Sequence, residues 1–320
     1  MHLIIAAVLT CLLGLTPLQA TAETYPSRPI KFVLPFGAGS ATDALARIVG
    51  NELAKSLGQP VVNVPKPGAN GAIAAVEVAR SAPDGYTFLF GTNSPFAVVP
   101  NLMKTPPYDV LSAFTPVTFL GENAFFITVH PSVPAKSIGE FIAYAKANPH
   151  KLNYGSGSTF AIVSAALFAA SSGLEMEHIP YKTEPDAIVD LLAGRIQLMN
   201  LTATTALPHA RADKLRVLAT TLQDRSPLLP NVPTLTEEKQ PRFPIVAWFG
   251  LVGPAGLPPE IVARMNKEMA AVLANPTVRE QLEAQGFSPR SSTPEELKAY
   301  MIEQLAIWKS ALKTAGIPQQ

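Results

Sequence analysis

Few residues of this chain could form a catalytic or metal centre. A single cysteine, Cys11, occurs among its 320 residues, which excludes an internal disulfide and a zinc site built on cysteines. Only 15% of the residues are charged, and 25 basic and 24 acidic residues leave a net charge of +1, unlike the basic surface typical of nucleic-acid binding. None of the five histidines has another histidine or cysteine at a metal-binding spacing. We therefore expect no metal, no cofactor and no nucleic-acid partner.

The sequence also lacks complete motifs of nucleotide-dependent and hydrolytic enzymes. Residues 37–42, Gly-Ala-Gly-Ser-Ala-Thr, match half of a dinucleotide-binding fingerprint, but Thr42 stands where the third glycine belongs. Residues 155–158, Gly-Ser-Gly-Ser, differ from the G-x-S-x-G elbow of hydrolases, because Ser156 directly follows Gly155. The sequence identifies no nucleophile paired with a base. These absences predict that the protein is not an enzyme.

One long apolar run is present, at the N-terminus. Residues 3–18 contain no acidic or basic side chain, and Ala20-Thr21-Ala22 fits the small-x-small pattern of a cleavage site. The run is short for a membrane span of about 20 residues. The segment before it offers only Met1 and His2, without the usual Lys or Arg. We expect residues 1–22 to be a signal peptide cleaved near Ala22, which would leave a secreted chain without cysteine.

The rest of the chain alternates between strand-like and helix-like patterns. Short apolar runs at 30–35, 61–64 and 87–90 are separated by stretches with helical spacing. The same alternation repeats between residues 125 and 220, and it predicts two α/β units with mostly parallel sheets covered by helices. After a proline-rich connection, a strand is expected at 247–252. Three helices then begin near Pro259, Pro276 and Pro294.

Three loops rich in Gly, Ser and Thr follow predicted strands, at 36–43, 91–96 and 155–159. In open α/β sheets, ligands bind beyond the carboxyl ends of the strands, and helix N-termini favour anions. One such site on each unit would hold a diacid at its two ends. The alternative is that these residues are only helix caps and turns, and that Asp43 serves the helix dipole. The candidate ligand-binding residues in these loops are Phe36, Gly39, Ser40, Ala41, Asp43, Thr92, Asn93, Ser94, Ser156, Gly157, Ser158 and Thr159.

Several long motifs, taken in order, resemble one family. The motifs are Tyr25-Pro26-Ser27-Arg28-Pro29-Ile30, Pro83-Asp84-Gly85-Tyr86-Thr87, Asn153-Tyr154-Gly155-Ser156, His178-Ile179-Pro180-Tyr181-Lys182, Val232-Pro233-Thr234 and Trp248-Phe249-Gly250-Leu251. The chain from Tyr25 to Pro318 resembles the receptors of tripartite tricarboxylate transporters, the Bug family of periplasmic binding proteins. The resemblance implies an α/β type II periplasmic-binding fold, with two lobes joined by two crossing strands, near 125–129 and near Trp248. Lobe 1 would comprise residues 23–124 and 246–320, and lobe 2 residues 125–245.

The resemblance also implies a function. Such a receptor is a periplasmic monomer that captures a small carboxylate between its lobes and delivers it to a membrane permease. The alternative is a periplasmic sensor that presents the bound acid to a signalling receptor. Tyr181, Asn200 and Thr202 complete the candidate ligand-binding residues.

The chain departs from the family pattern in ways that bear on the ligand. The third loop is about two residues shorter than is usual in the family, so that Ile162-Val163 align with His-Leu. Leu201 replaces an Asp that many members carry, which argues against an amino-acid ligand. Phe36, Phe96 and Phe126 are candidate aromatic walls. We therefore expect an aromatic dicarboxylate such as terephthalate.

Overall fold

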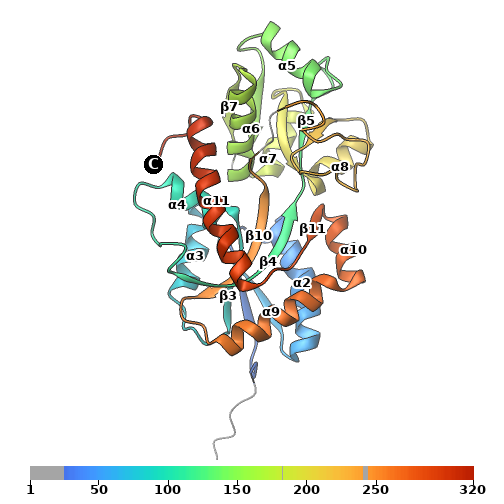
Figure 1. The fold of residues 1–320 in the computed structure, drawn as a ribbon. Coiled ribbons are helices and arrows are strands. Elements are labelled where there is room, and N and C mark those ends of the chain that lie inside the picture. The colour runs from blue at the N-terminus through green and yellow to red at the C-terminus, as the bar shows by residue number, and fades with distance from the viewer. Residues whose placement is uncertain (1–24, 182, 241–243) are drawn as a thin grey trace, which may run out of the picture.

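The strands of the protein form two separate sheets, one in each of two lobes (Figure 1). The computed structural model describes residues 25–181, 183–240 and 244–320. The predicted signal peptide and Cys11 lie outside these residues. The predicted fold class, two α/β lobes joined by two crossing strands, is confirmed. The exact limits of the lobes stay a prediction.

The larger sheet has six strands in the order β11-β4-β10-β3-β1-β2. β1 pairs in parallel with β2 and β3, whereas β10 and β11 pair antiparallel with their neighbours. Its strands are β1 (Ile30–Leu34), β2 (Val61–Pro65), β3 (Thr87–Thr92), β4 (Phe114–Asn123), β10 (Ala247–Pro254) and β11 (Phe287–Pro289). The elements around it are α2 (Ala41–Leu57), η1 (Ala69–Gly71), α3 (Ala72–Ala79), η2 (Ser94–Val98), α4 (Val99–Leu102), α9 (Pro259–Ala274) and α10 (Pro276–Ala284).

The smaller sheet has five strands in the order β7-β6-β8-β5-β9. β6 pairs in parallel with β7 and β8, and β5 lies antiparallel between β8 and β9. Its strands are β5 (Phe125–Val129), β6 (Asn153–Ser156), β7 (Glu177–Pro180), β8 (Leu198–Thr202) and β9 (Arg216–Thr220). Its helices are α5 (Ile138–Ala147), α6 (Thr159–Ser172), α7 (Glu184–Leu192) and α8 (Ala203–Arg211).

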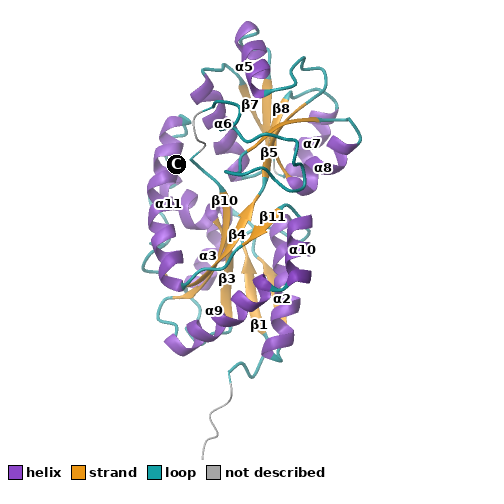
Figure 2. Cartoon of the chain, turned by 45° about the vertical axis from the view of Figure 1, so that its right-hand side comes forward, coloured by secondary structure: helices purple, strands orange, loops and turns teal. Residues whose placement is uncertain are grey.

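The two crossings between the lobes lie side by side. β4 ends at Asn123 in the larger sheet, and β5 begins at Phe125 in the smaller one, so the first crossing takes place at Ala124. The second crossing enters β10 at Ala247, which is the register partner of Asn123. Ala124 donates its amide to the carbonyl of Gly286, which ties the first crossing to the turn before β11. Figure 2 shows both sheets with the crossing strands between them.

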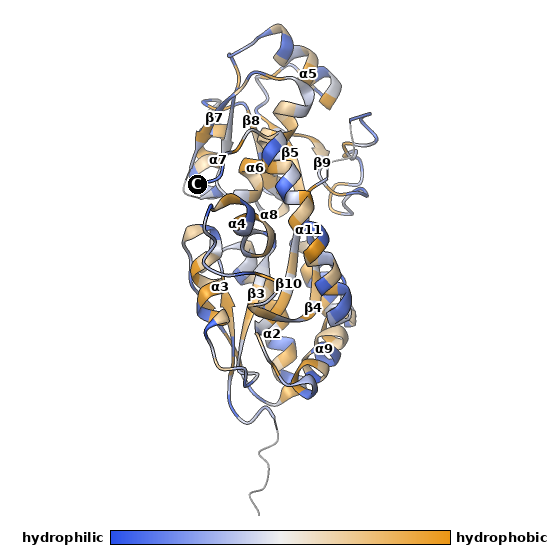
Figure 3. Cartoon of the chain, turned by 60° about the vertical axis from the view of Figure 1, so that its left-hand side comes forward, coloured by the Kyte–Doolittle hydropathy of each residue, from blue (hydrophilic) through white to orange (hydrophobic). Residues whose placement is uncertain are grey.

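The C-terminal helix α11 (Pro294–Thr314) runs along both lobes (Figure 1). Its first half packs on β4, and its second half packs on α6, where Trp308 is fully buried beside Phe160. The chain end is held by two hydrogen bonds, from Gln320 to Leu102 and from Lys104 to Gln320. Figure 3 shows hydrophilic residues on the outer faces of α9 and α11 and hydrophobic residues along β3, β4 and β10. α11 therefore joins the lobes through a shared apolar contact in addition to the two strands.

The expectation that the sheets are mostly parallel is wrong. The sheets are mixed, because strands that return from the other lobe enter antiparallel to their neighbours. The strands predicted from the sequence do not include β4, the ten-residue strand that begins the first crossing. The interior Pro116 and Gly121 interrupt its strand pattern. Gly121 adopts a φ of +143°, and the register between β4 and β10 shifts on both sides of Gly250–Leu251.

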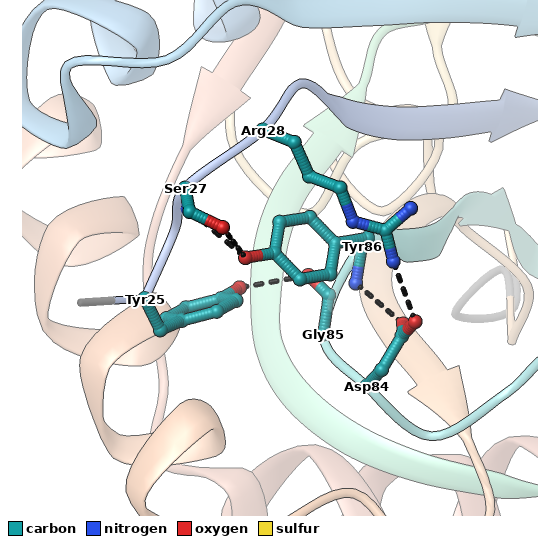
Figure 4. A network of polar contacts seen from close by, with 6 residues as sticks. All are labelled: Tyr25, Ser27, Arg28, Asp84, Gly85 and Tyr86. Atoms are coloured by element: carbon teal, nitrogen blue, oxygen red, sulfur yellow. Dashed lines mark hydrogen bonds and ion pairs between the residues drawn. The ribbon is translucent and has the colours of Figure 1, made fainter. Parts of the chain in front are cut away.

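Two of the motifs that carry the family resemblance meet at the far end of the larger lobe (Figure 4). The Tyr25 hydroxyl donates to the carbonyl of Gly85 over 2.8 Å, and the Ser27 amide donates to the Tyr86 hydroxyl over 2.9 Å. Arg28 pairs with Asp84 at 2.8 Å and lies 4.1 Å from the Tyr86 ring centre. These contacts attach the first described residues to the start of β3. Their role is structural, because they lie at the opposite end of the strands from the candidate loops.

Candidate ligand-binding site

The predicted loops gather at two sheet edges, one in each lobe. β1 and β3 are parallel partners, so the loops that follow them leave the same edge of the larger sheet. β6 and β8 are parallel partners in the smaller sheet, so Ser156 and Thr202 end neighbouring strands there. Loop amides and hydroxyl groups therefore collect at the carboxyl edge of each lobe, where α/β folds bind ligands.

The first loop is shaped by the buried carboxylate of Asp43. That carboxylate accepts the Gly39 amide, the Asn63 side-chain amide and the Arg47 guanidinium, each at 3.0 Å. Burial alone would raise the pKa of Asp43, but these three donors outweigh it and hold the pKa below its usual range. Asp43 thus stabilises the loop, and its contacts support the helix-start alternative. The amide of Gly39 is occupied by Asp43 and is not free for a ligand.

The start of α2 still offers unused donors. Ser40 caps the helix by accepting the Asp43 amide, and its own amide donates to Gly37. The amides of Ala41 and Thr42, at the first two positions of the helix, have no acceptor among the described residues. Two free amides at a helix N-terminus favour a negatively charged group. Phe36, at the beginning of the same loop, is half-buried.

The second loop is supported from behind by aromatic packing. The Phe96 ring lies against Gly91, where any side chain would collide with it, and stacks on Trp248 with ring centres 5.4 Å apart. This contact fixes η2 and places Thr92, Asn93 and Ser94, all buried, at the edge of the sheet. The Asn93 side-chain nitrogen is buried without a hydrogen-bond partner in the described structure. A buried donor left without an acceptor costs about 1–3 kcal/mol, so Asn93 would gain from a bound acceptor.

The third loop turns between β6 and α6. Ser158 caps α6 by accepting the Ala161 amide. Gly157 packs directly on the backbone of Thr183 and Glu184, which leaves no room for a side chain there. Ser156 and His178 share a 2.6 Å hydrogen bond, and the His178 ring stacks on Tyr154. Burial lowers the pKa of His178, which favours a neutral imidazole.

The Ser156–His178 contact is a hydroxyl–imidazole pair that the sequence analysis did not identify. In the catalytic triad of serine hydrolases, an acidic side chain orients the imidazole of such a pair. No acidic side chain bonds to His178 among the described residues. The pair therefore orients the Ser156 hydroxyl.

The two edges face each other and touch. Thr159, at the start of α6, donates its hydroxyl to the side-chain oxygen of Asn70 in the larger lobe over 3.0 Å. Ser94 lies 3.5 Å from the same Thr159 hydroxyl and donates to the Asn70 carbonyl over 2.7 Å. Predicted residues from the second and third loops thus meet across the lobe boundary.

Sequence reasoning missed Asn70, which stands between Gly68 and Gly71 in the turn before α3. Asn70 has a φ of +55°, and Gly71 packs against Pro35, so the turn lies beside the first loop. The residues Gly68-Ala69-Asn70-Gly71 are the only sequence signal of this position, because such clusters mark turns with left-handed residues.

A second contact between the lobes involves the end of β8. Ala203, the first residue of α8, lies against Gly286 in the larger lobe, where a side chain would collide with it. Immediately before it, Thr202 donates its hydroxyl to Glu184 over 2.7 Å, and its amide also points to this carboxylate at 3.3 Å. Glu184 was not among the predicted residues. Its position as the first residue of α7 is typical of an acid that serves only the helix dipole.

Two predicted residues donate their side-chain hydrogen bonds within the smaller lobe. The Tyr181 hydroxyl donates to Asp190 over 2.6 Å, and partial burial together with this bond raises the pKa of Tyr181 to about 12. Asn200 is fully buried within β8 and donates to Ser164 of α6 over 2.6 Å, and its side-chain oxygen is buried without a partner in the described structure. Both residues connect the smaller sheet to its helices.

The aromatic walls expected from the sequence are mostly core residues. Phe96 and Phe126 are fully buried, the first against Trp248 and the second in the apolar cluster between the smaller sheet and α7 and α8. Phe36 alone of the three keeps an exposed part. Two surface hollows, of about 320 and 480 Å³, lie at Tyr108–Leu111 and around Arg225, and no residue of the three loops lines either of them.

The two lobes, their paired crossings and the facing polar edges define the protein as a two-lobed binding protein. The profile described as the tripartite tricarboxylate transporter family receptor matches residues 45–317, and the chain belongs to this family. Members of the family are substrate-binding proteins, which confirms the prediction that the chain is not an enzyme. Within the described residues, the structure contains no helix long and apolar enough to cross a membrane.

Individual relatives span almost the whole chain. Protein BugT of Bordetella pertussis is 34% identical over 299 residues, which are 92% of this chain and 92% of BugT. The structure of R. palustris Rpa4515 with adipate is similar with a TM-score of 0.85 and 33% identity, covering 92% of this chain and all of Rpa4515. MatC from Rhodopseudomonas palustris with bound malate has a TM-score of 0.80 and 29% identity, covering 90% of this chain and all of MatC.

Proposed function

We propose that this receptor captures a small organic carboxylate between its lobes in the periplasm and delivers it to the permease of a tripartite tricarboxylate transporter. The observation that carries the proposal is the contact of the two polar sheet edges, where Ser94 and Asn70 meet Thr159. A ligand held at these edges would contact both lobes and favour their closed arrangement.

The donors at the edge of the larger lobe suit a carboxylate. The free amides of Ala41 and Thr42 lie at the start of α2, and the buried Asn93 side chain follows the neighbouring strand. A carboxylate would satisfy these donors with charge-assisted hydrogen bonds, which are stronger than neutral ones. The relatives with bound adipate and malate also hold small carboxylic acids.

The ligand-binding residues proposed for this site are a subset of the predicted set. They are Phe36, Ser40, Ala41, Thr92, Asn93, Ser94, Ser156, Gly157, Ser158, Thr159 and Thr202, to which the structure adds Thr42, Asn70 and Glu184. The aromatic dicarboxylate predicted from the sequence, terephthalate, has weaker support. Of the three proposed walls, only Phe36 can still line such a site.

The cellular setting proposed here follows from the N-terminus and the family. The apolar run before Ala22 would direct the chain to the periplasm and then be removed. Delivery to a permease is the role of a transporter receptor. We propose that the receptor works as a monomer, since each lobe edge meets its partner edge within one chain.

Mass spectrometry of the small molecules released from protein purified without refolding would identify the natural ligand. Calorimetric titration with adipate, malate, citrate, glutamate, benzoate and terephthalate would then rank the chemical classes. We expect at least one carboxylate to bind, and Ser94→Ala to weaken it about tenfold, the effect of one lost hydrogen bond of about 1.4 kcal/mol. Ser171→Ala, near the far end of α6, is the matched control. A ligand without a carboxylate would contradict the proposal.

A further inference from the structure

The carboxylate of Glu184 occupies the start of α8, a position that would otherwise favour an anion. It accepts the hydroxyl of Thr202 over 2.7 Å and lies 3.3 Å from the Thr202 amide. Thr205, in the first turn of α8, lies 3.2 Å from the same Thr202 hydroxyl. A negative charge fixed at a helix N-terminus satisfies the helix dipole and fills the place of a bound anion.

Glu184 lies at the lobe boundary. Thr202 directly precedes Ala203, which touches Gly286 of the larger lobe. The backbone of Glu184 packs on Gly157, two residues before Thr159, which bonds to Asn70 of the larger lobe. Both segments in contact with Glu184 therefore lead directly to contacts between the lobes. A ligand held at the proposed site would meet the Glu184 carboxylate at its lobe-2 end.

The environment of Glu184 differs from that of Asp43, the buried acid at the other edge. Asp43 is paired with Arg47, whereas no ion pair among the described residues includes Glu184. Burial raises the pKa of Glu184, and the hydrogen bonds from Thr205 and Thr202 oppose this only in part. Glu184 therefore gains from an additional hydrogen-bond donor or positive charge, and a second carboxylate beside it would be repelled.

We infer that Glu184 determines specificity: the ligand carries one carboxylate, bound at the larger lobe, and a hydrogen-bond donor such as an ammonium, hydroxyl or amide N–H at its other end. The inference rests on the proposed function and narrows its ligand class. It conflicts with terephthalate, whose second carboxylate would face Glu184. It also reopens amino compounds, which the absence of an acid at position 201 argued against, because Glu184 brings a carboxylate to the adjacent Thr202 from another helix.

Calorimetry with ligand pairs of matched length tests the inference. Glutarate is compared with 5-aminopentanoate and 5-hydroxypentanoate, and terephthalate with 4-(aminomethyl)benzoate and 4-(hydroxymethyl)benzoate. We expect the intact receptor to bind the amino or hydroxy member at least tenfold more tightly than the dicarboxylate of the same pair. Glu184→Gln keeps the size of the side chain and removes its charge, and it should reduce this preference at least tenfold.

Asp186→Asn is the control, because Asp186 is an exposed acid on the same helix that contacts Thr183, and its loss should leave the preference unchanged. An intact receptor that binds the dicarboxylate of a pair more tightly would overturn the inference, whether or not the variant folds. The inference would also be overturned if Glu184→Gln kept the full preference for the amino or hydroxy ligand over the dicarboxylate. If no member of any pair binds to either protein, the carboxylate-binding function itself is contradicted.

Discussion

The two lobes use the same local architecture but differ in how each holds the acid at its edge. Each has a parallel strand pair whose loops lead into helices, and each has a buried or half-buried acid beside a helix start. In the larger lobe, Asp43 is enclosed by Arg47, Asn63 and the Gly39 amide, and free amide donors remain at Ala41 and Thr42. In the smaller lobe, Glu184 occupies the donors of Thr202.

The difference shows that a helix N-terminus by itself does not decide what a lobe binds. The decisive quantity is which donors remain after the protein's own acids have taken theirs. When a cation neutralises the acid, as Arg47 does for Asp43, hydrogen-bond donors remain available at that edge of the sheet. When only neutral groups hold the acid, as for Glu184, the edge keeps a negatively charged hydrogen-bond acceptor.

Among the predicted substitutions, removal of the Trp248 side chain should have the largest effect on stability. Trp248→Ala deletes a fully buried ring stacked between Phe96 and Phe119, which should lower the free energy of unfolding by about 3–5 kcal/mol. Phe126→Ala is the counterpart in the smaller lobe, with a similar expected loss. Only Trp248→Ala should also weaken ligand binding through the loop after β3, because Phe96 rests on Trp248. Denaturant unfolding measures the stability, and calorimetry measures the ligand affinity. An equal loss of affinity in Trp248→Ala and Phe126→Ala would contradict the idea that Trp248 supports the loop after β3.

Alanine substitutions at one glycine in each lobe should affect the two lobes to different extents. Gly157→Ala places a methyl group against the backbone of Thr183 and Glu184, which should cost about 1–3 kcal/mol of stability and displace the loop of the smaller lobe. Gly39→Ala meets open space, and only its φ of +79° opposes the change, at about 1 kcal/mol. Thermal unfolding with ligand titration should therefore show a larger loss of affinity for Gly157→Ala. The reverse order would place the ligand mainly against the first loop.

The two acids should shift stability with pH in opposite directions. The folded pKa of Asp43 is lowered, so its contribution to stability is present above its unfolded pKa of about 3.9 and is lost as the pH falls through the folded value. The folded pKa of Glu184 is raised, so its contribution is present below its unfolded pKa of about 4.3 and is lost as the pH rises through the folded value.

Denaturant unfolding of the two variants across the acid range measures these contributions. Asp43→Asn should be least destabilised, relative to the unmodified chain, at low pH. Glu184→Gln should gain relative stability as the pH rises. If the relative stability of both variants changed in the same direction with pH, the contrast between the two acids would be contradicted.

The smallest change in free energy is expected from substitutions at the contact between the lobes. Thr159→Val and Asn70→Ala each remove one side of the 3.0 Å hydrogen bond, and their coupling in a double-mutant cycle should be about 0.5–1.5 kcal/mol. Small-angle scattering should show the variants to be more open without ligand. Strictly additive effects would show that the bond does not connect the lobes in solution.

The sequence predicted the local elements well where pattern and capping agree. Ser137, Ser158 and Thr293 cap the helices that they precede, and Pro259, Pro276 and Pro294 each stand at the first position of a helix. β4 was missed, because Pro116 and Gly121 break its alternation and its pairing partner β10 follows more than a hundred residues later. A pattern read along the chain carries no information about such a distant partner.

By itself, the sequence determined the class of the protein. The scarcity of cysteine, the strand–loop–helix repeats and the motifs between Tyr25 and Trp248 suffice for a two-lobed binding protein of this family. Only the tertiary structure decided which candidate groups are free. Asp43 takes the Gly39 amide, Asp190 takes the Tyr181 hydroxyl, and Glu184 takes the donors of Thr202. Hydrogen bonds of this kind depend on positions in space, which neighbouring residues in the sequence do not fix.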